Sequence, residues 1–461
     1  MGTAAKRNAA GKYQMDMCSG PLLRQIIVFA IPLMFTGMLQ LVFHFADLVV
    51  VGRFASHQAL AAVGSTTSLT HLQIGIFFGL AIGTNVLVAR YIGAKERTAI
   101  SQVVHTAMAF GLAGGIFMGV FGYTFARIFL RMMDTPDDVL DMAAEYMRIT
   151  FIGLPLLVLY NFGAAVLRAA GDTRRPFYFL IIGGLINVFL NLFFVIVCGM
   201  DVDGVAWATV ISQGGSLWLI LRVMQKMVGG CRFKLKKMKI HWLTLRDILW
   251  IGVPAGFQGA CFSIANIMIQ SSFNTFGSMA IAGNTMASQC EAFIFLANNS
   301  FAQAAISFVG QNLGGKQYKR VRQSVKYCLI TGFVILMIFV ALLYAFRVNA
   351  LSIFNKNPEV IKWGLLRFSI VLPLLFIGGW METFICALRG LGYSIAPTAI
   401  MIFGICVYRI IWIKTVFRAH PDCPEILLWS YPISWSIVAL LAMLFYLYAI
   451  KKYPAKNMPR I

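Results

Sequence analysis

The chain contains few charged residues, and few of those are acidic. Only 12% of its 461 residues are Asp, Glu, Lys or Arg, whereas about 25% is usual for a soluble globular domain. Hydrophobic residues make up 59% of the chain, and the mean hydropathy is +0.77. This composition excludes an ordinary soluble domain and indicates a protein that is embedded in a membrane.

Motifs for catalysis, metal binding and secretion are also missing. The nine cysteines show no C-x-x-C spacing, so neither a zinc site nor a disulfide framework is indicated. The sequence contains no phosphate-binding glycine loop, nucleophile elbow or H-E-x-x-H pattern. Residues 1–22 do not resemble a cleaved signal peptide and are expected to form a short cytoplasmic tail. We therefore expect neither an enzyme nor a bound cofactor or structural metal.

What the sequence does contain is a series of long apolar runs. A helix needs about 20 apolar residues to cross the hydrocarbon core, and it satisfies its own backbone hydrogen bonds there. The runs predict an all-α membrane protein with twelve spans, at residues 23–51, 59–89, 99–126, 139–165, 177–198, 205–225, 248–273, 280–309, 324–346, 364–387, 396–416 and 427–449.

The distribution of charge predicts the orientation of these spans. The chain has 39 Lys and Arg but 17 Asp and Glu, for a formal net charge of +22. The longest hydrophilic segment, Arg222–Arg246, carries eight Lys or Arg and no acid. If both termini are cytoplasmic, this segment and most other basic residues lie inside, as topology requires. We expect a multi-pass protein of the cell membrane whose basic charge faces anionic lipid, not nucleic acid.

The same short sequence markers occur in both halves of the chain, in the same order. Pro32 and Pro254 are 222 residues apart, and so are Pro136 and Pro358. Two further matches have an offset of 221 residues. Leu-Arg, Gly and Pro occur at the same positions of 167–176 and 388–397. Val, Gly and Lys occur at the same positions of 88–95 and 309–316. Four markers at nearly one offset indicate an internal duplication.

Each half contains six spans, and an even number gives both halves the same orientation in the membrane. Such parallel repeats are typical of transporters, in which a solute site lies between the halves near mid-membrane. The alternative is that the repeats only build a stable bundle. The predicted organisation is a tail (1–22), an N-lobe (23–225), a basic linker (226–247), a C-lobe (248–450) and a second tail (451–461).

Asp47, Glu291 and Glu382 lie within predicted spans, where a charge costs about 2.5–3.5 kcal/mol on insertion scales. Asp47 lies in the first span, and Gln40 and His44 precede it at helical spacing, so all three share one face. This face predicts a site for a proton or a solute. The alternative is that Asp47 lies near the surface and pairs locally with Arg53.

The other polar groups within spans have both a functional and a structural interpretation. Glu291 lies in the eighth span with Asn298 on the same face, and Glu382 lies in the tenth. Arg409, in the eleventh span, is expected to form a structural ion pair with one glutamate, which leaves the other free. Amides and hydroxyls in spans usually bond neighbouring helices; here they are Asn187, Asn191, Thr209 and Gln213.

Several motifs together resemble the multidrug and toxic compound extrusion (MATE) transporters over residues 20–450. They are Ala46-Asp47 before Val51-Gly52-Arg53, the two L-R-x-x-G turns, and the runs 204–209 and 309–314. The resemblance implies a V-shaped pair of six-helix lobes that export lipophilic organic cations in exchange for inward H⁺ or Na⁺. We expect such a transporter to act as a monomer. A lipid-linked oligosaccharide flippase of the same superfamily is the alternative.

The resemblance also implies roles for individual residues. Asp47 looks like the coupling carboxylate of the first span, with Asn187 and Thr209 as its polar neighbours. Asn191 departs from members that have an aspartate there, which leaves only a weak Na⁺ site at Asp47. Glu291 matches a glutamate of the eighth span in bacterial members, and Glu382 matches more loosely. Together with Gln40, His44 and Asn298, these two acids are candidates for a solute site or a second coupling site.

Overall fold

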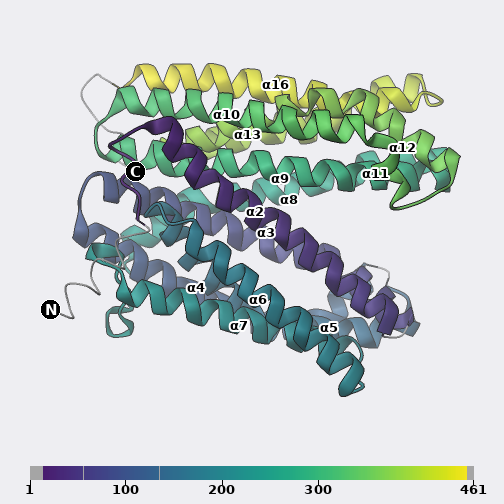
Figure 1. Cartoon of the computed structure of the whole chain (residues 1–461), viewed down its shortest axis with the longest axis horizontal. Helices are drawn as coiled ribbons and strands as arrows, with labels where there is room; N and C mark the ends of the chain where they lie inside the picture. The colour runs from purple at the N-terminus through teal and green to yellow at the C-terminus, as the bar shows by residue number, and fades with distance from the viewer. Residues whose placement is uncertain (1–13, 55–56, 134, 454–461) are drawn as a thin grey trace. The chain divides into compact units, whose positions relative to one another are not determined.

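The computed structural model describes residues 14–54, 57–133 and 135–453, and its long elements are helices (Figure 1). The first half of the chain contains α2 (Leu22–Phe54), α3 (His57–Gly93), α4 (Arg97–Met132), α5 (Asp137–Ala169), α6 (Arg174–Leu192) and α7 (Val202–Lys226). The second half contains α8 (Trp242–Phe273), α9 (Ser278–Gly314), α10 (Tyr318–Ala345), α11 (Arg347–Ser352), α12 (Pro358–Ile370), α13 (Leu375–Gly390), α14 (Ile395–Met401), α15 (Tyr408–Trp412) and α16 (Pro424–Lys451).

Among the described residues, twelve helical stretches are long and apolar enough to cross a membrane, and each predicted span overlaps one of them. The prediction of an all-α membrane protein with twelve spans is confirmed. Two spans of the second half are interrupted. A 3₁₀ turn, Leu372–Leu374, separates α12 from α13, because Pro373 lacks the N–H that a continuous helix needs. Two π-helical turns, Ile402–Val407 and Ile413–Phe417, flank α15.

The duplication is visible in the backbone as well as in the sequence. Lys95 and Lys316, which follow α3 and α9, both adopt left-handed conformations, with φ of 60° and 58°. Gly171 and Gly392, which follow α5 and α13, have φ of 85° and 94°. Left-handed φ values are uncommon for residues with a Cβ. The recurrence of each conformation after 221 residues therefore confirms that the two halves repeat one design.

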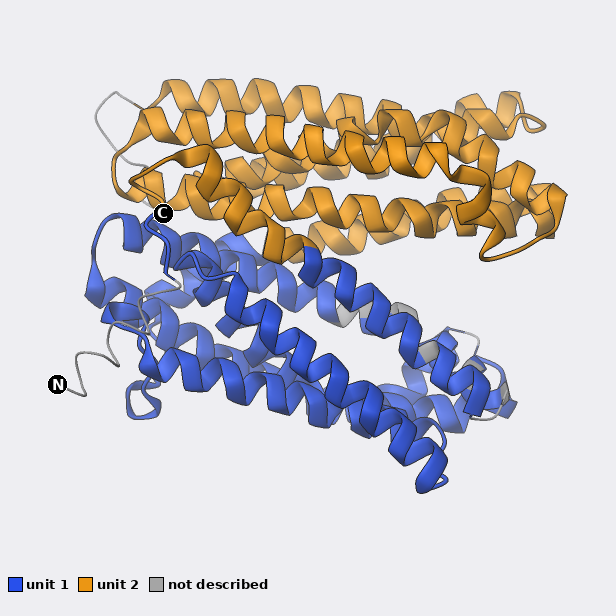
Figure 2. Cartoon of the chain, in the orientation of Figure 1, with its two compact units in different colours: residues 1–16, 35–253 blue, residues 17–34, 254–461 orange. Residues whose placement is uncertain are grey.

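The chain divides into two compact units, shown in Figure 2. Phe35–Val253 belongs to the first unit, and Met17–Met34 and Pro254–Ile461 belong to the second. Both divisions fall inside helices beside the repeat-related prolines, Pro32 in α2 and Pro254 in α8. The units therefore differ from the predicted lobes 23–225 and 248–450, because the first part of each helix belongs with the other half of the chain.

Contacts at the start of α2 explain why this segment belongs to the second unit. The backbone N–H of Met17 donates to the Gln311 side chain at 3.2 Å, and the Met17 carbonyl accepts from Asn312 at 3.2 Å. The guanidinium of Arg320 donates to the carbonyls of Met17 and Gly20 at 3.0 Å each. Side chains at the end of α9 and the start of α10 thus hold the backbone that leads into α2.

The first part of α8 packs in the corresponding way within the first unit. Gly252 of α8 lies against α3, where a Cβ at this position would approach the Leu80 Cα to 2.7 Å. Just before α8, the backbone N–H of His241 donates to the Thr106 hydroxyl of α4 at 3.2 Å. Side-chain hydrogen bonds thus hold the backbone that leads into each of α2 and α8, and close packing at Gly252 adds to them in α8.

Asp172, in the turn between α5 and α6, supports a prediction about pH. Burial raises the pKa of this carboxyl to about 6, although Arg175 lies 3.3 Å away and opposes the shift. Because the folded pKa exceeds that of the unfolded chain, the stability from protonation is full below about 3.8 and is lost as the pH rises through about 6. We expect Asp172→Asn to raise the unfolding temperature at pH 8 relative to the unmodified protein, and by less at pH 5. Equal changes at both pH values would contradict the assignment.

Candidate functional site

In the first unit, a chain of hydrogen bonds connects Asp47 of α2 with α6 and α7. The Asn191 side-chain amide donates to the Asp47 carboxylate at 2.6 Å and lies 3.3 Å from the side-chain oxygen of Asn187. The Asn187 amide in turn donates to the Thr209 hydroxyl at 3.2 Å. Thr209 donates to the carbonyl of Val205 at 3.0 Å. The structure thus brings together the four residues predicted for the coupling site.

Local sequence explains how three helices meet at this point. Asn187 and Asn191 are one turn apart on α6, so both side chains lie on the same face. One turn earlier, α6 carries Gly183 and Gly184, and both are buried. A Cβ at Gly183 would overlap the side chain of Ser216 on α7, and one at Gly184 would overlap Phe43 on α2. The glycine pair therefore allows close approach on both sides, beside the two asparagines.

The surroundings of Asp47 leave its charge without a basic partner. Its side chain is half-buried, and no Lys or Arg in the described part of the chain forms an ion pair with it. Arg53, the alternative partner, is exposed near the end of α2. Gln40 and His44 are exposed on the same helix. A half-buried carboxylate that accepts a hydrogen bond from an amide and has no ion pair in the described chain can bind a proton, or can join carbonyl and hydroxyl oxygens around a small cation.

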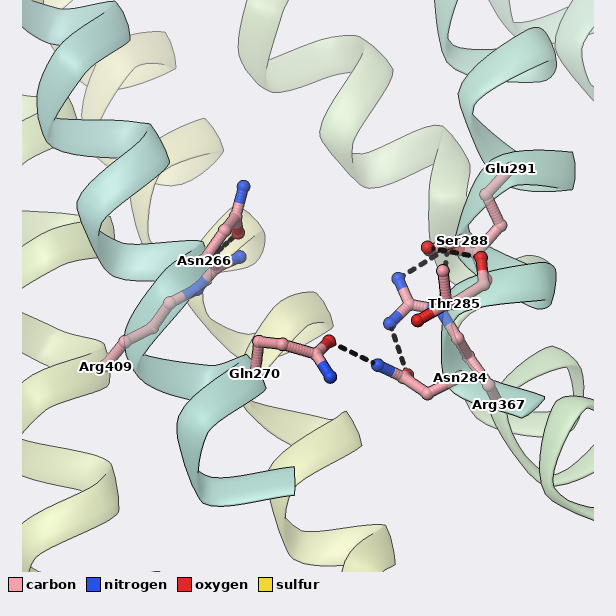
Figure 3. A network of polar contacts seen from close by, with 8 residues as sticks. All are labelled: Asn266, Gln270, Asn284, Thr285, Ser288, Glu291, Arg367 and Arg409. Carbon is pink, nitrogen blue, oxygen red and sulfur yellow. Dashed lines mark hydrogen bonds and ion pairs between the residues drawn. The ribbon is translucent and has the colours of Figure 1, made fainter. Parts of the chain in front are cut away.

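The second unit contains a different polar network, shown in Figure 3. Glu291 of α9 and Arg367 of α12 form a buried ion pair, with the Arg367 Nη2 atom 2.7 Å from the Glu291 carboxylate. The Arg367 Nε atom lies 3.1 and 3.0 Å from the two oxygens of that carboxylate. Arg367 also donates to Asn284 at 2.9 Å, and Asn284 donates to Gln270 of α8 at 3.1 Å. Glu291 is therefore held in place and neutralised.

The prediction that Arg409 forms an ion pair with a glutamate is wrong. Arg409 is fully buried on α15, but no carboxylate among the described residues lies within ion-pair distance of it. Its guanidinium donates to the side-chain amide oxygen of Asn266 at 2.8 Å and to the Ser434 hydroxyl at 3.2 Å. It also lies 4.4 Å from the ring centroid of Tyr431. Neutral oxygens and an aromatic face thus take the place of the expected glutamate.

The expectation that Arg409 pairs with one of the two glutamates is corrected for both of them, because Glu291 pairs with Arg367 instead. Glu382 of α13 is half-buried, contacts the Cys386 thiol at 3.8 Å and has no ion pair in the described chain. The nearby Arg389 instead donates to Gln258. Asn298 is buried against Gly332 and Gly379. It takes no part in the hydrogen bonds between Glu291 and Arg367. The C-lobe candidates therefore do not form one acidic site.

Sequence reasoning missed Arg367, which lies near one end of the predicted tenth span. This position near a span end is typical of a charge that sets topology, but α12 continues beyond Arg367 to the break at Pro373. Its partner lies 76 residues earlier in the chain. The available signal was a second arginine inside the apolar stretch Pro358–Gly390. A basic residue inside a membrane span usually pairs with another ionisable residue or with backbone carbonyls, so this arginine predicts a buried partner.

Comparison with known proteins assigns the chain to a class of membrane transporters with two repeats. The MatE family model matches residues 32–193 and 254–413, one stretch in each half. The chain belongs to the MatE family of transporters. The two matched stretches begin at the repeat-related prolines Pro32 and Pro254, in agreement with the duplication.

The relatives and solved structures match this chain over most of its length. A probable multidrug resistance protein of Bacillus subtilis, YoeA, is 29% identical, with 93% of this chain and 94% of that protein covered. An FAD transporter of Shewanella oneidensis is 25% identical, with 79% and 81% covered. An outward-facing multidrug resistance MATE family transporter has a TM-score of 0.87 at 21% identity, with 94% and 97% covered. The last comparison supports the fold alone.

Proposed function

We propose that this protein is a secondary multidrug antiporter that exports lipophilic organic cations in exchange for inward H⁺. The observation that carries the proposal is the hydrogen-bonded Asp47, which has no ion-pair partner among the described residues. Such a carboxylate can be protonated from one side of the membrane and deprotonated to the other, because no fixed positive charge holds it ionised. Several relatives are named multidrug resistance proteins.

The choice of H⁺ over Na⁺ rests on the groups around Asp47. Its hydrogen-bonded neighbours Asn191, Asn187 and Thr209 are uncharged. A Na⁺ site at Asp47 would have a single carboxylate, and the Asn191 amide already directs a donor at it. The described residues contain no group of three or more His, Cys, Asp or Glu side chains that could hold a metal ion. We therefore assign H⁺ as the coupling ion and keep Na⁺ as the outcome to be tested against it.

The solute class follows from the distribution of charge between the two units. Asp47 offers a negative charge in the first unit, whereas Glu291 is already paired with Arg367 in the second. Solute and proton can therefore compete for Asp47, and this competition couples their movements. A flippase for a lipid-linked oligosaccharide remains the alternative, but none of the relatives described above carries that name.

The orientation and assembly of the transporter are part of the same proposal. We place both termini and the basic linker on the cytoplasmic side of the cell membrane, because the linker is the most basic segment outside the spans. We propose that one chain suffices for transport, since both repeats are present in it. Labelling of cysteines introduced at residue 236 and at residue 203 should report opposite sides of the membrane.

The proposed activity is tested first in whole cells. Cells that express the protein should accumulate a fluorescent lipophilic cation about tenfold less than cells without it, if a pH gradient of one unit drives the export. A protonophore should abolish this difference within the same experiment, because it removes the gradient. Export that persists with the protonophore and stops when Na⁺ is removed would identify Na⁺ as the coupling ion. Equal accumulation with and without the protein would refute the proposed function.

A further inference from the structure

The basic linker, which has no role in the proposed transport mechanism, forms part of a cavity in the first unit. The cavity has a volume of about 770 Å³ and lies between the first three turns of α4 and the chain from Gly229 to His241. Six basic side chains and no acid line it: Arg97, Arg232, Lys234, Lys236, Lys237 and Lys239. A volume of this size is typical of sites for small organic ligands.

The linker is fixed to α4 by specific contacts, so the cavity is a built feature of the fold. His105 of α4 accepts the backbone N–H of Lys234 at 3.1 Å, while its other ring nitrogen lies 2.7 Å from the carbonyl of Ser101. The ring also stacks on Phe233, with centroids 5.6 Å apart. Gly230 lies so close to α4 that a Cβ there would approach the Arg97 carbonyl oxygen to 2.5 Å.

The backbone of the linker concentrates the lysines around this space. A 3₁₀ turn at Leu235–Lys237 is closed by the Lys237 N–H, which donates to the carbonyl of Lys234 at 2.9 Å. The turn is exposed, so its lysine side chains are available to a ligand. Repulsion between like charges opposes such a cluster unless an anion offsets it. Topology alone requires basic residues on this side of the membrane but does not require them around one cavity.

The start of α4 adds to the positive potential. Arg97, Thr98 and Ser101 line the cavity, and the side chain of the N-cap residue Glu96 makes no capping hydrogen bond. Backbone N–H groups at a helix start are donors without intrahelical acceptors and carry a partial positive charge. Free donors next to several lysines and arginines match the oxygens of a phosphate group. An organic cation would be repelled by the same groups.

We propose that this cavity binds a phosphate-bearing anion, separately from the path of the transported cation. The ligand chemistry is a phosphate mono- or diester with at least one further polar group, because six basic side chains exceed the charge of one inorganic phosphate. An anionic lipid headgroup and a soluble phosphate compound share this chemistry. Because the linker leads from α7 into α8, an anion bound here would also stabilise the linker in its docked position.

The test measures binding of inorganic pyrophosphate to the full-length protein in nanodiscs of zwitterionic phosphatidylcholine, by calorimetry at low salt. We expect saturable binding that weakens about tenfold in Lys234→Gln/Lys236→Gln, since both lysines line the cavity. The matched control is Arg222→Gln/Lys226→Gln, which removes the same charge from exposed positions outside the cavity. It should change the affinity by less than about twofold.

Further arms identify the source of the ligand and protect the test against misfolding. Nanodiscs with phosphatidylglycerol should weaken pyrophosphate binding if a lipid headgroup occupies the cavity, and should leave it unchanged if the natural ligand is soluble. If the double variant elutes as aggregate, Arg97→Gln replaces it, because this side chain is exposed and lines the same cavity. No binding to the unmodified protein, or equal weakening in the cavity and control variants, would overturn the proposal.

Discussion

Asp47→Asn should abolish gradient-driven export while leaving the amount of folded protein nearly unchanged. In proteoliposomes, a pH gradient of one unit should concentrate a monovalent cation about tenfold when one proton is exchanged per cation. The variant should give a concentration ratio of about one, because an amide cannot bind and release the proton. Its folded yield should survive, since a neutral side chain of the same shape is no harder to bury than a carboxylate.

Two controls make this result specific to the site. Asp138→Asn makes the same chemical change at an exposed position at the start of α5, and it should keep the full concentration ratio. Thr209→Val removes the hydroxyl that accepts from Asn187 and should weaken transport without abolishing it. Full gradient-driven export by Asp47→Asn would remove Asp47 from the mechanism.

Glu291→Gln should cause a large loss of folded protein, which reverses the role expected from sequence. The substitution leaves the Arg367 guanidinium charged and buried without its carboxylate partner. Breaking a buried ion pair from one side costs about 3–5 kcal/mol. Fluorescence-detected size-exclusion chromatography after heating should therefore show a lower unfolding temperature and a smaller monodisperse peak.

Glu382→Gln is the matched control, because it makes the same change on a glutamate with no ion pair in the described chain. It should leave the unfolding temperature much closer to that of the unmodified protein. The double variant Glu291→Gln/Arg367→Gln should recover part of the lost stability, since it removes both buried charges. Equal destabilisation by Glu291→Gln and Glu382→Gln would show that the ion pair does not carry the effect.

The fold was predictable because its signals are local in the sequence. Each span is a continuous apolar run, and the repeat is marked by residues with special backbone roles, such as Gly171 and Gly392 at their left-handed turns. The division of α2 and α8 between the two units was not predictable. It depends on contacts such as those of Met17 with Gln311, which lie 294 residues apart, and no local pattern records them.

The site was predictable in one half of the chain and not in the other. In the first unit, Asp47 is the single acid in its span, and its amide neighbours share one helix face. In the second unit, several charged residues were available, and the pairing depends on how each helix is rotated. Arg409 was expected to need a carboxylate, but Asn266, Ser434 and the ring of Tyr431 satisfy it instead. Spacing along one helix does not determine contacts between helices.

The central claim, that Asp47 couples cation export to inward proton movement, is tested most directly by measuring both ions at once. The purified protein is reconstituted into vesicles that contain a pH-sensitive dye or a Na⁺-sensitive dye, and an organic cation gradient is the sole driving force. The account predicts that cation movement in one direction drives at least one proton per cation in the other, and that Asp47→Asn moves neither. Cation movement without any proton counterflow, or with an equal Na⁺ flux in its place, would contradict it.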